Sequence, residues 1–339
     1  MWKQLAMSGI AFSVCAGGTA DAQVSVTPYG VVDTAMEYQN GGAGSQVRQV
    51  SSALYATVYG FKGSEDLGNG THVNFQLEEG FDNTTGQMSA AGTAFNRLAW
   101  VGISGTFGEL RIGRQKKPQY LFLNNESDPT GVKSIASPLN NFGDNSVRSS
   151  NAIAYFTPTV YGFSEQFMVA LREEADQSAL VSYNAVMRYV NGQLRVLAGY
   201  EKTGATGTSL AQKVLRGVVS YGIGDVRLYL AYQGESRSDG SEHLQIYEAS
   251  GAWRFTPANQ LSILYGYARD RSGAGGSGQQ LGLLYQYKLS RRTELYSASG
   301  ILQNRNQAQY TLDGTQYSGI PGAPGAWVRG INFGIAHHF

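Results

Sequence analysis

Hydrophobic and polar side chains alternate along many short stretches of this chain. The last thirteen residues, 327–339, place apolar side chains on one face and small or polar ones on the other. The same period of two recurs at residues 73–78, 226–233 and 281–288, and it predicts β-strands. The final strand ends the chain on its apolar face with no polar tail, which is typical of outer-membrane β-barrels. In such barrels the apolar face meets lipid and the polar face meets a lumen.

The connections between these strands alternate between short and long. Eight long polar links alternate strictly with seven short turn-rich ones, so fifteen connections join sixteen antiparallel strands. A sheet this long must close, since open edges would leave backbone groups unsatisfied in hydrocarbon. We therefore expect an all-β, sixteen-stranded antiparallel transmembrane β-barrel around a water-filled lumen, with short periplasmic turns, long external loops and both chain ends in the periplasm. The short links are 63–70, 104–109, 157–162, 190–193, 222–225, 256–260 and 289–293, and the long ones are centred on 41–50, 82–93, 117–147, 173–178, 203–210, 236–243, 270–278 and 304–324.

The amino terminus has the features of a secretory signal. Lys3 precedes a mostly apolar stretch, and Ala20-Asp21-Ala22 is a small-x-small cleavage site. We expect residues 1–22 to be removed, which leaves 23–339 as the barrel. A membrane anchor is the alternative, but the apolar stretch falls short of the ~20 residues that a helical span requires. Cys15 is the only cysteine, and the residues before it match a lipoprotein site poorly, so the mature chain has no thiol.

Composition narrows the class of protein further. Charged residues make up 15% of the chain, below the ~25% of soluble proteins, yet no run of 18 apolar residues follows the signal. Glycine (44), tyrosine (21) and phenylalanine (14) are abundant and proline (8) is scarce, which suits many strands joined by tight turns. The net charge of +1 gives no reason to expect a nucleic-acid partner. Nothing in the sequence indicates a cofactor or a metal site.

Seven segments carry a resemblance to a known family over essentially the whole mature chain. The segments are VTPYGVVD (26–33), GFKGSEDLG (60–68), NRLAWVGISG (96–105), IGRQ (112–115), AYFTPTVYGF (154–163), YKLSRRTELY (287–296) and GIAHHF (334–339). They resemble the trimeric general-diffusion porins of Gram-negative outer membranes. The resemblance implies a homotrimer in which the third external loop folds into each barrel. It also implies an outer-membrane location in contact with lipopolysaccharide, insertion by the barrel assembly machinery, and Phe339 as the terminal assembly signal.

The longest connection, residues 117–147, is a candidate functional loop, because a loop of this length without secondary structure is usually functional. It contains Glu126, Asp128 and Asp144. These acids are either ordinary solvated loop residues or, if the loop lies in the lumen, the acidic side of a pore constriction.

Basic residues on the strands supply the opposite charge. Strand parity predicts that Lys62, Arg97 and Arg111 point inward, and Arg148 lies where the long loop returns to the barrel. These four residues are the candidate basic wall of the constriction, with Arg97 the strongest candidate.

Two positions depart from the family pattern. Val58 and Ala154 stand where the family commonly has inward arginines. Both departures remove positive charge, so the sequence leaves the sign of ion selectivity open.

The function that these features indicate is passive diffusion of ions and small hydrophilic solutes, oriented by charged groups in the lumen. A channel specific for a small anionic or sugar solute is the alternative. Tyr265, Tyr267, Tyr285 and Tyr287 fall on the outward parity, however, which favours an interfacial girdle over a sugar slide. An enzyme is not expected, because the four histidines are scattered and form no catalytic constellation. The histidines are His72, His243, His337 and His338.

Overall fold

The computed structural model describes residues 25–171, 182–204, 211–272 and 275–339. Within them one antiparallel sheet contains seventeen strands. The strands are β1 (Ser25–Asn40), β2 (Ser45–Ser51), β3 (Val58–Gly68), β4 (Thr71–Gly80), β5 (Leu98–Gly105), β6 (Gly108–Lys116), β7 (Arg148–Phe156), β8 (Phe163–Ala170), β9 (Ser182–Asn191), β10 (Leu194–Thr203), β11 (Gln212–Ile223), β12 (Val226–Arg237), β13 (His243–Thr256), β14 (Asn259–Asp270), β15 (Ser277–Lys288), β16 (Thr293–Arg305) and β17 (Trp327–His338). The predicted signal at 1–22 and the loop at 173–178 lie outside the described residues.

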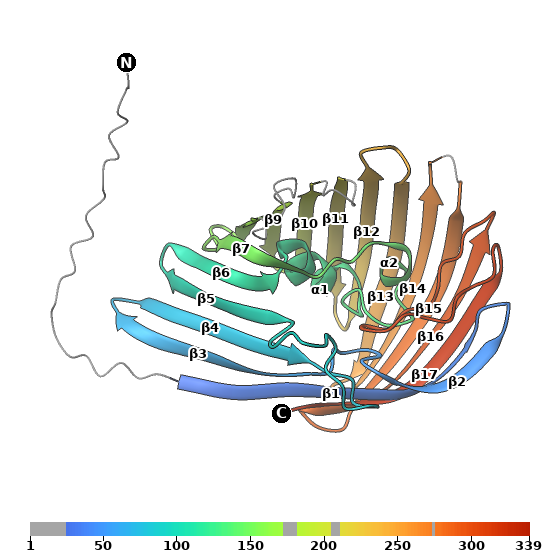
Figure 1. Ribbon diagram of the computed structural model, residues 1–339, viewed down its shortest axis with the longest axis horizontal. Helices are drawn as coiled ribbons and strands as arrows, with labels where there is room; N and C mark the ends of the chain where they lie inside the picture. Colours follow the sequence, from blue (N-terminus) through green and yellow to red (C-terminus); the bar gives the residue numbers. More distant parts are fainter. Residues whose placement is uncertain (1–24, 172–181, 205–210, 273–274) are drawn as a thin grey trace, which may run out of the picture.

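The sheet closes on itself as a sixteen-strand barrel (Figure 1). β1 pairs with β17 on one side. On its other side β2 pairs with residues 34–40 and β3 pairs with residues 25–31, so β2 and β3 together form one interrupted barrel strand. When β2 and β3 are counted as one, the seventeen strands make a barrel of sixteen strands, which confirms the predicted fold.

The interruption at residues 52–57 corrects one predicted loop. The sequence suggested an external loop over 41–50, but the connection spans only 41–44, and a strand resumes at Ser45. The chain leaves that strand at Ser52, whose φ of 64° breaks the extended backbone. The buried Asp33 carboxylate then accepts hydrogen bonds from the backbone N–H groups of Leu54 (2.8 Å) and Tyr55, which fixes the break.

The short turns all lie between the strand pairs that the sequence predicted, and the two ends of the barrel meet at the turn side. The backbone N–H of Gly30 donates to the Phe339 carbonyl (3.1 Å), and the N–H of Phe339 donates to the Gly30 carbonyl (3.0 Å). Gly30 has no side chain on the outer face, and the Phe339 ring occupies that place: an ideal Cβ at Gly30 would lie 2.2 Å from Phe339 Cζ. The last residue therefore completes barrel closure.

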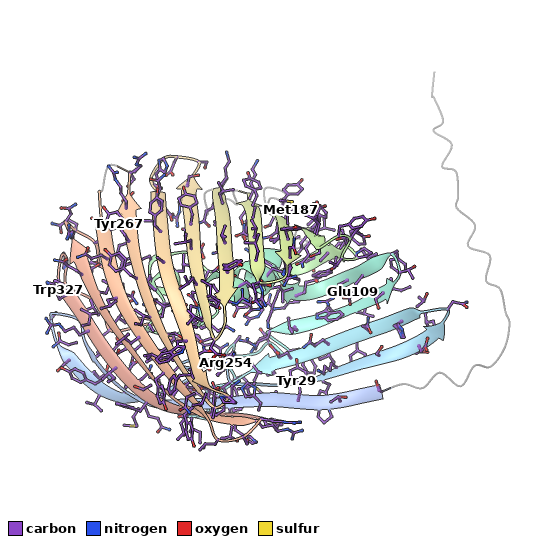
Figure 2. The ribbon with its side chains drawn as sticks, turned by 180° about the vertical axis from the view of Figure 1, so that it is seen from behind. Tyr29, Glu109, Met187, Arg254, Tyr267 and Trp327 are labelled. Atoms are coloured by element: carbon purple, nitrogen blue, oxygen red, sulfur yellow. The ribbon has the colours of Figure 1, made fainter. Side chains whose placement is uncertain are left out.

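The outer surface is mostly apolar, as the alternation predicts. On β17, Trp327, Ile331, Phe333 and Ile335 are exposed, while the intervening Val328 and Asn332 are buried. Figure 2 shows Tyr267 and Trp327 near the strand ends that lead into long connections. No helix among the described residues is both long and apolar enough to cross a membrane.

Candidate functional site

The connection 117–147 folds into the barrel, as predicted for the third external loop. It contains the short helices η1 (Gln119–Asn124), α1 (Asn125–Ser127) and α2 (Pro138–Phe142). η1 contacts β9 to β11, α1 contacts β11 and β12, and α2 contacts β13 to β15. Figure 1 shows α1 and α2 inside the ring of strands. The loop thus lies against one side of the inner wall and narrows the lumen.

Glycines on three successive strands allow this close approach. An ideal Cβ at Gly266 would lie 2.2 Å from Pro138 Cβ. At Gly282 it would lie 1.9 Å from the Ala136 carbonyl oxygen, and at Gly300 it would lie 2.5 Å from the Ile135 carbonyl oxygen. We call Gly266, Gly282 and Gly300 the glycine seam. Because none of the three has a side chain, the loop backbone packs directly on the wall.

Charged side chains hold the loop to the same wall. Glu126 on α1 lies between two arginines: Arg188 Nε is 2.7 Å from Oε1, and Arg195 Nη1 is 3.4 Å from Oε2. Lys117 pairs with the buried Glu201 at the start of the loop. Arg216 donates to the Asp144 carbonyl oxygen (2.7 Å) near its end. The loop is therefore fixed at its beginning, its tip and its end.

The three loop acids that the sequence singled out have different surroundings. Glu126 is neutralised by its two arginines. Asp128 is almost fully buried, and its carboxylate accepts hydrogen bonds from the Thr130 N–H (2.6 Å), the Val132 N–H (3.1 Å) and the Ser137 hydroxyl (2.6 Å). Burial raises the pKa of Asp128 above its usual range. Only Asp144 is exposed, and it lies on the side of Arg216.

The opposite side of the lumen carries a group of cations around a single acid. Arg97 Nε is 2.7 Å from Glu78 Oε1, and both side chains are buried. Lys116 interacts electrostatically with Glu78, Arg97, Arg148 and the loop residue Lys133. We call Arg97, Lys116, Lys133 and Arg148 the basic cluster. It brings together two of the predicted wall residues, Arg97 and Arg148, with two lysines that the sequence analysis did not single out.

Arg97 reaches this cluster by a different route from the one predicted. Simple parity placed it inward on a strand, but it lies one residue before β5, where Leu98 takes the inward position opposite Glu78. Its side chain instead crosses the inner face of the neighbouring strand: an ideal Cβ at Gly80 would lie 2.8 Å from Arg97 Cδ. The arginine lies at the inner face of the wall because strict alternation has not yet begun at that residue.

The other two predicted wall residues lie on the same side of the barrel, nearer the turns. Lys62 Nζ is 5.6 Å from the centre of the Tyr29 ring. The Arg111 guanidinium lies between the rings of Trp100 (4.2 Å) and Phe156 (4.4 Å) and pairs with Glu109. Arg111 is therefore held in place by stacking, and Lys62 is the more exposed charge.

A second connection also enters the lumen, and the sequence analysis did not anticipate it. The last external connection, between β16 and β17, buries Leu312 completely, and the Gln39 side chain donates to the Leu312 carbonyl (2.7 Å). The N–H of Asp313 donates to Asn141 Oδ1 of the third loop (2.9 Å). The two inward loops therefore contact each other. A sequence signal existed in the row Gly282, Gly300 and Gly330, which are direct cross-strand neighbours.

The loop-anchoring arginines were also missed, although a signal for them exists. Strand parity also places Arg188, Arg195 and Arg216 on the inner face of β9 to β11. Their pairing with particular loop residues could not be read from parity, because it depends on how the loop folds.

Comparisons with known proteins agree with this geometry. A family model described as Gram-negative porin matches residues 8–307. Outer membrane porin protein 32 of Delftia acidovorans is 29% identical over 349 residues, which cover 96% of this chain and 97% of that protein. Major outer membrane protein P.IB of Neisseria meningitidis is 31% identical over 196 residues, covering 52% of this chain and 54% of that protein.

Solved structures show the same barrel. The anion-selective porin from Comamonas acidovorans superimposes with a TM-score of 0.81 at 26% identity, covering 94% of this chain and 100% of that one. An outer membrane protein of Vibrio cholerae, described as a trimer form, has a TM-score of 0.71 at 13% identity, covers 93% and 99% of the two chains, and shows the fold alone. The family model, the relatives, the closed barrel and the two inward loops together lead to one conclusion: this chain belongs to the Gram-negative porin family and is an integral outer-membrane β-barrel that forms a diffusion channel for ions and small hydrophilic solutes.

Proposed function

We propose that this porin passes anions in preference to cations. The observation that carries the proposal is the imbalance of available charge at the constriction. The basic cluster holds four cations around the single carboxylate of Glu78, whereas the loop acids are neutralised, buried or remote from it.

Salt bridges within the described residues support this imbalance. Within the described residues, Lys116, Lys133 and Arg148 have no carboxylate within salt-bridge distance. The nearby Glu78 is already paired with Arg97. On the opposite wall Glu126 is shared by Arg188 and Arg195, so one positive charge remains there as well. A passing ion therefore meets its largest excess of positive charge at the basic cluster.

The size of the expected effect follows from simple electrostatics. A unit charge ~4 Å from a passing ion is worth about 1 kcal/mol in water and is screened over ~10 Å at 0.1 M salt. A few uncompensated cations therefore suffice for a several-fold preference at low salt and a weaker one at high salt. The Comamonas acidovorans structure, described as an anion-selective porin, is consistent with this sign.

The test is the reversal potential of purified channels in a planar bilayer under a potassium chloride gradient. We expect a sign that corresponds to chloride preference, which decreases as the salt concentration rises. Lys133→Glu should move the potential toward potassium, because it inverts one charge of the basic cluster. The matched change Lys213→Glu, on the outward face of β11, should leave the potential unchanged. A potassium preference in the unmodified channel would overturn the proposal.

The seven predicted constriction residues take different parts in this scheme. Arg97 and Arg148 supply charge at the narrow part, and Lys62 and Arg111 supply charge nearer the turns. Glu126 and Asp128 keep the loop in place, and Asp144 is the loop acid that remains open to solvent. Single variants that remove one charge separate these roles. Loss of a basic residue should change the reversal potential, whereas loss of Glu126 or Asp128 should increase current noise.

Assembly and processing are proposed on the strength of the family. We expect a homotrimer in contact with lipopolysaccharide, inserted by the barrel assembly machinery, and cleaved after Ala22. Native mass measurement, depletion of the assembly machinery and amino-terminal sequencing test these points in turn.

We also expect no hydrolytic activity. The family and fold are those of channels. Proteoliposomes that swell in sugar solutions without releasing fatty acids would agree with this expectation, and lipid hydrolysis would contradict it.

A further inference from the structure

The turn between β15 and β16 borders a cavity that the diffusion pathway does not account for. This turn belongs to the YKLSRRTELY segment and lies at the end of the barrel where the chain termini meet. The cavity has a volume of about 700 Å³, within the range of small-molecule sites. Figure 2 shows Arg254, on β13, at the same end of the barrel. The side chains that matter here are Tyr55, Lys288, Arg291, Arg292, Glu294 and His338.

The charge of this cavity is strongly one-sided. Lys288, Arg291 and Arg292 are exposed, and within the described part of the chain none of the three has a carboxylate within salt-bridge distance or a side-chain hydrogen bond. Glu294 is the only acid among the lining residues. With His338 neutral, the cavity carries two uncompensated positive charges.

Ordered contacts hold the cavity walls in place. The Tyr55 ring meets the His338 ring edge-on at 5.1 Å between centroids. The Gln286 side chain donates to the Tyr55 hydroxyl and to Glu294 Oε1, both at 3.4 Å.

The turn itself is tied to the end of the last strand. The Arg292 carbonyl accepts a hydrogen bond from the His338 N–H (2.7 Å), and the Leu289 N–H donates to the Thr293 carbonyl (2.9 Å). The cations therefore project from a turn whose backbone is held in place.

We propose that this cavity, which we call the mouth pocket, binds small multivalent anions carrying two or more carboxylate or phosphate groups from the periplasmic side. Several separated cations favour a ligand with several separated negative groups, because each group gains its own contact, whereas chloride gains only one. The proposal rests on the chain being a diffusion channel. It adds that multivalent anions dwell at the mouth and interrupt the flow of smaller ions.

The test uses full-length channels in planar bilayers with citrate, a tricarboxylate, as the probe. Citrate added to the periplasmic side should interrupt the chloride current, whereas acetate should not. Inorganic phosphate in a separate arm distinguishes carboxylate from phosphate recognition. Because Cys15, the one cysteine of the sequence, lies in the expected signal, a single Ser238→Cys change in an external connection reports the orientation of each channel through an impermeant thiol reagent.

Two variants should shift the block in opposite directions. Replacing Lys288, Arg291 and Arg292 by glutamine should raise the citrate concentration for half-block by about tenfold or more. Glu294→Gln removes the only acid and should lower that concentration several-fold. Unblocked conductance in 1 M potassium chloride close to that of the unmodified channel shows that both variants are folded.

A charge-matched control separates a site from general attraction. Replacing Lys202, Lys213 and Arg269, which lie on the outward parity near the external ends of their strands, by glutamine removes the same charge and should leave the block unchanged. Equal block from both sides, or equal loss in the two triple variants, would overturn the mouth pocket. A chloride-preferring channel without sided block would refute the mouth pocket alone, whereas a potassium-preferring channel that citrate still blocks would refute only the selectivity proposal.

Discussion

The position of Val58 shows how one side chain influences the constriction. Val58 lies on the inner face of β3, directly opposite Gly80 across the strand pair. The Arg97 side chain crosses that face beside it, at the edge of the basic cluster. Val58 is itself buried, so a longer cationic side chain at this position would have to extend along the inner face past Arg97 to reach water.

We expect Val58→Arg to increase anion preference several-fold at low salt, because it adds a unit charge within a few ångströms of the ion path. The reversal potential in a potassium chloride gradient measures the change. Val58→Leu fills similar space without charge and should behave like the unmodified channel. Equal potentials for Val58→Arg and Val58→Leu would contradict the assignment of this wall to the constriction.

The Glu126 clamp gives a second prediction for a single residue. Glu126→Gln removes the carboxylate that Arg188 and Arg195 share, so it frees positive charge and loosens the loop tip. We expect about a twofold increase in anion preference together with noisier open-channel current. Glu165→Gln, on the outward parity of β8, is the matched control and should change neither quantity. Quiet current with unaltered selectivity would show that the clamp is dispensable.

At the scale of elements, the inner wall and the third loop are matched to each other. The glycine seam provides a surface on which loop carbonyl groups can lie, and Asp128 organises the loop that lies there. Loop position thus depends on missing side chains in the wall as much as on contacts within the loop.

Gly282→Ala tests this dependence, because its new methyl group would meet the Ala136 carbonyl oxygen at 1.9 Å unless the loop moves. We expect a cost of about 1–3 kcal/mol in loop packing, seen as altered conductance and frequent current fluctuations in an intact barrel. Gly217→Ala is the control, since nothing lies within 4 Å of the added atom. Stable, unaltered conductance of Gly282→Ala would mean that the loop does not rest on the seam.

Strands and turns could be predicted from the sequence, whereas the loops and side chains that fill the lumen could be predicted only in part. Alternation and turn residues are local signals, so the strand pairs and the limits of the 117–147 loop agree with the structure. The break at 52–57 escaped detection, because it depends on the Asp33 carboxylate, a contact 21 residues away in sequence. The position of Leu312 and the partners of Glu126 depend on still longer-range packing, which periodicity does not encode.

At the scale of the whole molecule, the barrel is a closed wall with two loops packed inside it. Because the third and last loops hydrogen-bond through Asn140, Asn141 and Asp313, each supports the other. The conductance therefore reflects both loops together.

Replacing residues 309–322 by a short Gly-Ser linker should raise single-channel conductance and the size limit for neutral sugars, because it removes the segment packed beside Gly300 and Gly330. It should also increase the noise of the open-channel current, because the third loop loses its contacts with this segment. Liposome swelling with sugars of increasing size measures the first effect and bilayer recording the second. An unchanged size limit would show that this connection does not restrict the passage.

Barrel closure gives the final prediction. Deleting Phe339 removes the backbone pair with Gly30 and the ring that covers it, so we expect lower outer-membrane levels and accumulation in the periplasm. Phe333→Leu, which changes an outward side chain elsewhere on β17, should assemble normally. Cell fractionation measures both variants. Normal levels of the deletion variant would remove Phe339 from the assembly signal.

The one-sided attachment of the third loop also affects neighbouring channels. Its helices contact β9 to β15, so the open passage runs beside the opposite wall and not along the barrel axis. In a trimer, the distance between passages is then set by the rotation of each barrel about its own axis, and not by barrel width alone. Passages closer than the ~10 Å Debye length at 0.1 M salt influence one another electrically, whereas more distant ones conduct independently. Subunit orientation thereby becomes a determinant of whether three pores conduct as one unit or as three.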